Sequence, residues 1–272
     1  MRRAAGLLPG EAKTDSRDAF VIAMTARCMP HALRRLLPAD EARSDLIALA
    51  AHDEDCRCDM TRETNRLRAH LVECHLAFER ALGDSVTSPF VLRLLEKYGG
   101  PWGIRRTGRA RVMRWAGGQK RVPARTLERL LDAAWEMAEA PAGAAVREEL
   151  AIPACARRIA SLAAERKELA GRMASLLAAD PTYIALTSIP GVGAKTAATF
   201  IACVDIDAFP TAGHLASYAG IAPKTHQSGT SIKGESAARI GNRALKNALF
   251  LSAFASLRCD PLSRAHYDKK RA

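Results

Sequence analysis

Long apolar runs are missing from this chain of 272 residues. No stretch approaches the roughly 18 apolar residues of a membrane-spanning helix, and no apolar segment follows the opening Met-Arg-Arg as it would in a secretion signal. The 7 cysteines are odd in number and include no CxxC pair, which argues against a disulfide framework. We therefore expect a cytoplasmic protein with reduced thiols and no membrane partner.

Closely paired cysteines of the kind that hold structural zinc are missing too. The stretch that comes nearest to a zinc site contains His52, Cys56, Cys58, His70, Cys74 and His75. These residues do not form the closely spaced ligand pairs of structural zinc sites, and the segment has helical periodicity. Ordinary buried or solvated helix positions are the favoured interpretation.

Acidic residues are scarce relative to basic ones. The chain has 41 Lys and Arg against 29 Asp and Glu, a net charge of +12, which favours a polyanionic partner such as nucleic acid. Residues 97–126 hold nine basic residues and no acidic one, with Trp102 and Trp115 between them. Their glycines and prolines predict a loop-rich basic surface. A second basic region runs from Lys224 to the end.

Alternating strand patterns are scarce, and helical periodicity dominates. Apolar residues recur at helical spacing from Ser44 to Leu82, which predicts one long amphipathic helix. Steps of three and four from Ile159 to Leu176, interrupted only by Arg166, predict a coiled-coil segment. Its partner is either another helix of this chain or a second copy, and the pattern does not decide between them. Further helices are expected at about 125–139 and 237–257.

The stretch LTSIPGVGAKTAATFIA, Leu186 to Ala202, matches a helix-hairpin-helix pattern. Gly191 and Gly193, on either side of Val192, permit a tight turn and a close approach to a phosphate, while the next helix directs free N–H groups at the anion. Lys195 and Thr196 add a charge and a hydroxyl. Such a motif binds the backbone without reading sequence, so these residues are predicted DNA ligands; the alternative is a plain glycine-rich turn.

Two short motifs contain residue types that catalyse phosphoryl transfer. In KTDSRDA, Asp15 and Asp18 share one face of a helix and together could bind a divalent cation. In the turn-rich THQSGTSIKG, Ser228 is a candidate nucleophile, with His226 and Lys233 as charge stabilisers. Each motif alone is weak, because acidic pairs at this spacing are common on helices and most loop serines only form turns.

Taken in order, the motifs KTDSRDA, IPGVGAKTAA, FPTAGHLASYAGIAP, HQSGTSIKG and RIGNRALKNAL resemble the DEDD-type insertion-sequence transposases, which include Piv-type DNA invertases and bridge-RNA-guided recombinases. The resemblance covers nearly the whole chain. It implies a mainly α protein in three parts: a remnant of an RNase H-like (RuvC-like) domain at 1–42, a helical and coiled-coil middle at 43–180, and a C-terminal transposase domain at 181–272.

The resemblance also implies a chemistry. Asp15 and Asp18 match the last two acids of the family's metal-binding set, and Ser228 matches its nucleophilic serine, with Ser217 in LASYAG as the second choice. Mg²⁺ would help the serine attack DNA and form a phosphoserine link. Lys233 and Arg243 join the expected DNA ligands. DNA is the implied partner, a structured guide RNA is left open as a second one, and recombination between two sites suggests a homodimer or homotetramer.

The sequence departs from the family pattern at its start. Only 12 residues precede Lys13, whereas the family carries an Asp and a Glu on strands upstream of this motif. A site for two metal ions normally needs more carboxylates than two, so we expect a transposase whose own metal site is incomplete through truncation. The rivals are a helix-hairpin-helix DNA glycosylase that uses Asp205 or Asp207, and a basic adaptor that only holds DNA or RNA.

Overall fold

The computed structural model describes residues 14–28, 41–136, 139–228, 232–238 and 240–271. The chain divides into two units, residues 1–41 and 42–272, and each is described by itself. The described part is mainly α, as predicted. Its helices are α2 (Asp15–Cys28), α3 (Glu41–Cys74), α4 (Leu76–Leu82), η2 (Gly83–Thr87), α5 (Pro89–Tyr98), α6 (Pro101–Thr107), α7 (Arg109–Gly117), α8 (Ala124–Ala134), α9 (Ala144–Val146), η3 (Arg147–Ala151), α10 (Ile152–Leu176), α11 (Pro181–Thr187), α12 (Ala194–Cys203), η4 (Ile206–Ala208), α13 (Ala212–Ala219), α14 (Arg243–Cys259) and α15 (Pro261–Arg271).

In the first unit the described element is the helix α2. Its first turn holds Asp15 and Asp18, where acidic side chains favour the positive end of the helix dipole. Phe20 and Ile22 are about half exposed, whereas Val21 is buried. One helix does not test the expected RuvC-like remnant, which stays a prediction.

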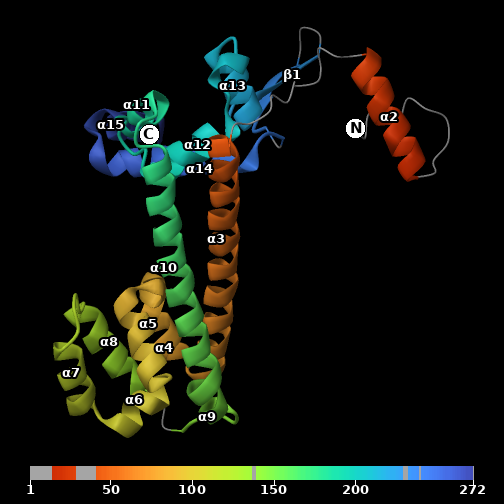
Figure 1. Cartoon of the computed structure of the whole chain (residues 1–272). Helices are drawn as coiled ribbons and strands as arrows, with labels where there is room; N and C mark the ends of the chain where they lie inside the picture. The colour runs from red at the N-terminus through yellow and green to blue at the C-terminus, as the bar shows by residue number, and fades with distance from the viewer. Residues whose placement is uncertain (1–13, 29–40, 137–138, 229–231, 239, 272) are drawn as a thin grey trace. The chain divides into compact units, whose positions relative to one another are not determined.

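In the second unit, α3 and α10 run side by side in opposite directions (Figure 1). The apolar steps predicted for a coiled coil are buried at Ile159, Leu169 and Met173, but Leu176 is 40% exposed. The seam is interrupted at Arg166 because its guanidinium forms two hydrogen bonds of 3.0 Å to the carboxylate of Asp53 on α3. In the described structure, therefore, the partner of α10 is a helix of the same chain.

The single helix expected from Ser44 to Leu82 is broken at His75. This residue has an extended backbone, and its ring Nδ1 accepts a hydrogen bond from the Phe78 N–H at 3.2 Å, which caps α4. Burial lowers the pKa of His75, so the ring stays neutral and able to accept. Apolar periodicity continues across the break, which is why the sequence did not reveal it.

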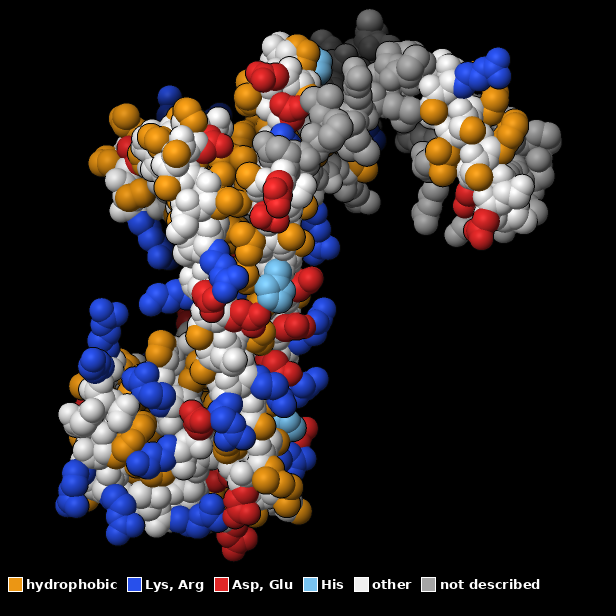
Figure 2. All heavy atoms as spheres, viewed as in Figure 1, with side chains coloured by type: hydrophobic (Ala, Val, Ile, Leu, Met, Phe, Trp, Pro, Cys, Tyr) orange, Lys and Arg blue, Asp and Glu red, His pale blue; other side chains and the backbone are white. Residues whose placement is uncertain are grey.

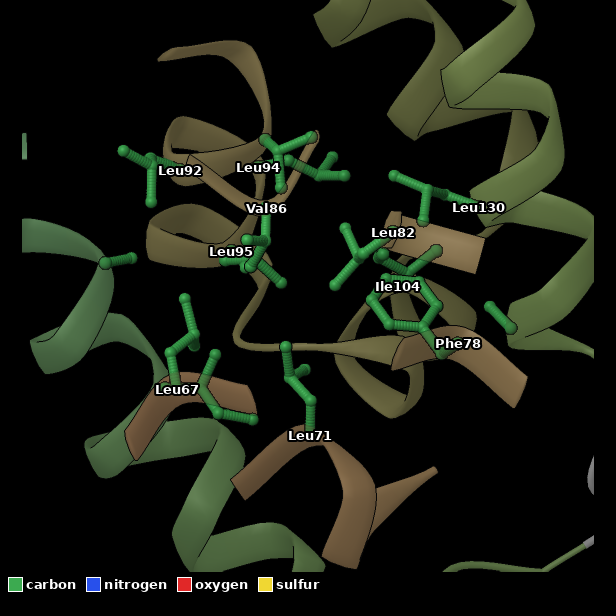
Figure 3. Packing of buried hydrophobic residues seen from close by; sticks show 14 of the residues in the cluster. Leu67, Leu71, Phe78, Leu82, Val86, Leu92, Leu94, Leu95, Ile104 and Leu130 are labelled. Carbon is green, nitrogen blue, oxygen red and sulfur yellow. The ribbon is translucent and has the colours of Figure 1, made fainter. Parts of the chain in front are cut away.

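The helical module α4 to α8 packs against one end of α10, and its apolar core is drawn in Figure 3. Phe78, Leu82 and Leu130 are fully buried there. The prediction of a loop-rich surface at residues 97–126 was wrong: α6 and α7 occupy much of it, and its glycines and prolines, apart from Gly103 within α6, lie at helix ends. Glycine is enriched just after helices and proline at their first position, so these residues do not distinguish a helix boundary from a loop.

A buried carboxylate holds α6 in place. Glu148 is 2% exposed and accepts hydrogen bonds from the backbone N–H groups of Trp102 (3.0 Å) and Gly103 (2.7 Å). These are free donors of the first helical turn. Burial raises the pKa of Glu148, opposed by the two N–H groups and Arg106. The contact joins the basic helices to the segment that leads into α10.

The C-terminal module begins at α11 and packs around Phe200, Val204, Ala219 and Leu245. The stretch expected to be a turn-rich loop forms two antiparallel strands, β1 (Lys224–Ser228) and β2 (Ile232–Ser236), with Ser228 opposite Ile232. The helix predicted from residue 237 begins only at Arg243, after the N-cap Asn242. Polar strand residues carry no apolar alternation, so the sequence pattern could not reveal this pair.

Candidate nucleic-acid interface

The predicted hairpin consists of α11, a tight turn and α12, and we call residues 181–203 the first hairpin. Asp180 caps α11 by accepting hydrogen bonds from the N–H groups of Thr182 (2.7 Å) and Tyr183 (3.1 Å). The turn is closed by hydrogen bonds from Ile189 N–H to the Leu186 carbonyl (3.1 Å) and from Val192 N–H to the Ile189 carbonyl (3.0 Å). Two short helices thus present a fixed turn.

The two glycines of this turn have different surroundings. Gly191 has φ +85°, and a Cβ there would lie 2.4 Å from the carbonyl oxygen of Ser252 and 2.6 Å from the nitrogen of Ser256, both on α14. Gly193 has an ordinary φ of −91° and is exposed, and apart from its two chain neighbours no described residue has an atom within 4 Å of a Cβ there. Gly191 therefore lets the turn pack on α14, and Gly193 leaves the start of α12 open to a ligand.

Lys195, a predicted DNA ligand, is paired within the chain. Its ammonium lies 2.5 Å from a carboxylate oxygen of Asp53, which also receives Arg166. Burial alone would raise the pKa of Asp53, but the hydrogen bonds from Arg166 and Lys195 outweigh it and hold the pKa below its usual value. The three charges link α3, α10 and α12, so Lys195 anchors the first hairpin to the helix pair beneath it.

Replacing Asp53 by asparagine is expected to destabilise the chain at pH 7 by about 1–3 kcal/mol, because Arg166 and Lys195 lose a shared and partly buried partner. Because the folded pKa is lowered, the carboxylate stabilises the fold above about pH 4 and contributes less as the pH falls through that pKa. Urea unfolding at pH 7 and pH 3 measures the difference. Asp59→Asn, which removes an exposed partner of Arg62 on the same helix, is the matched control and should change stability by less than about 1 kcal/mol. A pH-independent loss in the Asp53 variant would contradict the assignment.

Residues 220–241 contain β1, β2 and the candidate nucleophile Ser228, and the two ends of this segment lie in contact on the C-terminal module. Gly220 ends α13, and Gly241 precedes α14; a Cβ on Gly241 would lie 2.6 Å from the Cα of Gly220. Asn242 donates its backbone N–H to the Tyr218 carbonyl (2.8 Å) and its side-chain amide to the Tyr218 hydroxyl (3.1 Å). The two ends of the β1–β2 segment are therefore clamped together.

Ser228 is the last residue of β1, next to residues 229–231, which lie outside the described residues. Lys233 is in β2, where it pairs with Gln227, and His226 pairs with Gly234. The two strands therefore extend away from the glycine clamp, and Ser228 is the residue of β1 farthest from it in sequence. Ser217, the second choice, is exposed on α13, and Arg243 is exposed as the first residue of α14.

Asp15 and Asp18, the expected metal ligands, are both exposed in the first turn of α2. Within the described ranges, no further His, Cys, Asp or Glu joins them in a group of three. Two carboxylates on one helical face suit one Mg²⁺ that keeps several waters. They do not supply the donor set for a pair of ions.

Two of the histidines and cysteines considered above as zinc ligands, His52 and Cys56, lie close to the carboxylate of Glu165. His52, Cys56 and Glu165 each offer an atom within 4.8 Å of the others, and His52 Nε2 lies 2.8 Å from a carboxylate oxygen of Glu165. Burial and the negative charge of Glu165 raise the pKa of Cys56. A raised pKa opposes the thiolate that metal binding needs, so we interpret the trio as a polar link between α3 and α10.

Sequence reasoning missed the residues that position the interface. Asp53 and Arg166 lie far from the hairpin in sequence, and Tyr218 and Asn242 resemble ordinary surface residues. Tyr218 also donates its hydroxyl to the Cys203 carbonyl at the end of α12 (3.3 Å), which connects the glycine clamp to the first hairpin. Arg166 carried a signal, because a lone charge within an apolar seam suggests a buried partner.

Two family models match the chain. A model described as the Transposase IS116/IS110/IS902 family matches residues 184–268, and a model described as transposase matches residues 1–76. The 43.6 kDa protein of insertion element IS110 from Streptomyces coelicolor is 44% identical over 274 residues, which cover 100% of this chain and 67% of that protein. This chain belongs to the IS116/IS110/IS902 family of insertion-sequence transposases.

Two further relatives extend the comparison. The 42 kDa protein of insertion element IS900 from Mycobacterium paratuberculosis is 33% identical over 276 residues, covering 100% of this chain and 68% of that protein. A pilin gene-inverting protein from Moraxella bovis is 46% identical over 70 residues, 25% of this chain and 22% of that protein. Across the described parts of this transposase, no helix is both long enough and apolar enough to traverse a bilayer.

Proposed function

We propose that this chain binds duplex DNA of its insertion element through the first hairpin and cuts and rejoins strands with Ser228 as the nucleophile. The observation that carries the proposal is the exposed turn at Gly193, which opens α12 inside the segment that matches the transposase family. An exposed glycine allows a phosphate to approach the backbone N–H groups at the start of the helix. Family membership favours this activity over base excision by Asp205 or Asp207.

The first hairpin would bind the sugar-phosphate backbone. The first turn of α12 leaves N–H groups without helical partners, and Thr196 adds a hydroxyl there. Ile189, 50% exposed in the turn, offers apolar contact to a groove wall. Because Lys195 is held by Asp53, the N–H groups carry most of the phosphate binding, with Arg243 and Lys233 as additional cations. Contacts of this kind position DNA without reading its sequence.

In the proposed reaction, strand transfer takes place in two steps with Ser228 as the nucleophile. Its hydroxyl oxygen attacks a backbone phosphorus, so an O–P bond to serine forms while the P–O bond to one deoxyribose breaks. The serine proton passes to water, and the departing deoxyribose oxygen takes up a proton from water. A hydroxyl of a second strand end then attacks the phosphoserine, which restores the serine and conserves the phosphodiester.

A bound Mg²⁺ would supply positive charge against the phosphate. Asp15 and Asp18 are the residues that would hold it, as a single ion that keeps several waters. The remaining work falls to side chains and backbone of this chain, which hold the DNA and position the serine.

A covalent link between Ser228 and a DNA phosphate tests the proposal. The full chain is incubated with Mg²⁺ and a plasmid that carries the ends of its insertion element, and the reaction is stopped with detergent. After nuclease and protease digestion, mass spectrometry should find a nucleotide on the peptide that contains Ser228. A nucleotide on the Ser217 peptide would move the nucleophile to α13. DNA binding without any adduct would instead support the adaptor function.

A further inference from the structure

The basic segment contains a second helical hairpin with the backbone pattern of the first. Residues 111–130 and 181–200 show the same succession: seven helical residues, a four-residue turn, two residues without regular structure, and seven helical residues. We call residues 109–134, which comprise α7, its turn and α8, the second hairpin. It lies between the two family matches, which cover residues 1–76 and 184–268.

Two of the hydrogen bonds in and beside the turns correspond as well. Gln119 N–H donates to the Ala116 carbonyl at 2.9 Å, as Ile189 N–H does to Leu186 in the first hairpin. Leu127 N–H donates to the Pro123 carbonyl at 2.9 Å and opens α8, as Ala197 N–H does to Gly193 at the start of α12. The two hairpins thus share these two hydrogen bonds as well as the succession of helices and turn, whereas the bond from Val192 N–H to the Ile189 carbonyl is a feature of the first hairpin.

The two hairpins differ at one equivalent position of the turn. Arg121 stands where the first hairpin has Gly191, and it has φ +55°, the one positive φ among the described non-glycine residues. The glycine is needed in the first hairpin because the backbone of α14 packs against it. Arg121 is exposed, and its guanidinium makes no ion pair among the described residues. The turn of the second hairpin is therefore left open.

The open turn is more basic than its counterpart. Lys120, Arg121 and Arg125 are exposed there, and none of the three forms a salt bridge within the described chain. Arg125 occupies the place of Lys195, but it has no salt bridge to a described carboxylate, whereas Asp53 pairs with Lys195. Figure 2 shows Lys and Arg side chains gathered over this module. Arg93 on α5 braces the turn through Gln119 (3.0 Å) and the Lys120 carbonyl (3.4 Å).

We propose that the second hairpin is a second binding site for the backbone of duplex DNA, with Lys120, Arg121 and Arg125 as its phosphate ligands. The choice of duplex DNA rests on the proposed function of the first hairpin, since the same turn geometry suits the same ligand. The evidence for a phosphate ligand, the exposed cations of the second hairpin, does not depend on the proposed function of the first hairpin. Unpaired exposed cations bind phosphates and release counterions.

The two sites are far enough apart to hold separate stretches of DNA. The module of the second hairpin packs on Ile152, Cys155 and Ile159 of α10, and Ala198 of the first hairpin packs near Leu169 and Met173. Cys155 and Met173 are 18 residues apart on α10, which corresponds to about 27 Å at about 1.5 Å per residue. A straight duplex would need about 8 base pairs to cover that distance.

The test compares two triple variants of the full chain that remove equal charge. One carries Lys120→Gln, Arg121→Gln and Arg125→Gln; the control carries Lys269→Gln, Lys270→Gln and Arg271→Gln at the exposed end of α15. Fluorescence anisotropy gives the Kd for a random duplex of about 25 base pairs over a range of salt. The first triple should bind at least about tenfold more weakly than the control and lower the salt slope by about 2 to 3. Equal Kd values for the two triples would overturn the proposal.

Arg121→Gly separates a binding role from a structural one. Glycine adopts φ +55° without strain, so this variant should be at least as stable as the wild type by thermal unfolding. It should nevertheless weaken DNA binding, by about threefold to tenfold, because one phosphate ligand is lost. A variant that gains stability and keeps full affinity would show that Arg121 does not touch DNA.

Two further measurements distinguish DNA from RNA as the ligand and test the first and second hairpins independently. A folded RNA hairpin of similar length replaces the duplex; a larger loss for RNA than for DNA in the first triple would overturn the DNA assignment. Gly193→Ala in the first hairpin is measured in parallel. If it leaves the Kd unchanged while the first triple weakens binding, the first hairpin fails as a DNA site and the second stands.

Discussion

Ser228→Ala is expected to abolish strand joining, with recombination of a plasmid-borne insertion element falling below about one thousandth of the wild-type level, because no other group replaces the lost nucleophile. DNA affinity should change by less than about twofold, since one neutral hydroxyl at the end of β1 contributes little to a backbone-binding surface. The loss would therefore fall on the chemical step alone. Recombination frequency and the Kd for element DNA, measured on the same preparations, give both quantities.

Ser217→Ala is the matched control for this result. It removes the same hydroxyl from α13, where Ser217 is exposed, and should leave recombination within about threefold of the wild type. If Ser217→Ala abolished joining and Ser228→Ala did not, the nucleophile would lie on α13. If neither variant changed recombination, a serine mechanism at these two positions would be wrong.

The sequence predicted the helical class and the hairpin turn because both follow from local patterns. Apolar spacing fixes the buried face of α10, and a Gly-Val-Gly turn between apolar segments has few alternative conformations. The family resemblance reached further, and the comparisons confirm it. The resemblance indicated the transposase family from an ordered set of motifs, although the sequence alone did not show how those motifs are arranged in the structure.

The remaining features depend on contacts between distant parts of the chain. The hairpin at residues 109–134 was hidden because its key position holds Arg121, and no pattern for a glycine turn finds an arginine there. Asp53 pairs with Lys195 across 142 positions of sequence, and the packing of Gly220 on Gly241 has no periodic signal. Such contacts are fixed by tertiary packing, which local propensity does not encode.

Gly191→Ala is expected to destabilise the C-terminal module by about 2–5 kcal/mol. The new Cβ would lie 2.4 to 2.9 Å from backbone atoms of Ser252 and Ser256 on α14, and a backbone cannot rotate away as a side chain can. Alanine at φ +85° adds strain of about 1–2 kcal/mol. Chemical unfolding of the full chain measures the loss, and DNA affinity should fall with it because the turn leaves α14.

Gly193→Ala makes this prediction specific, because it adds the same methyl group two positions away. Its φ of −91° is ordinary, and apart from the two chain neighbours no described residue has an atom within 4 Å of the new Cβ, so stability should change by less than about 1 kcal/mol. The methyl group would instead stand between an approaching phosphate and the N–H groups of α12, and we expect the Kd for duplex DNA to rise by about tenfold. One glycine would then serve the fold and the other the ligand. Equal effects of the two substitutions on stability would remove the distinction between a packed and an open side of the turn.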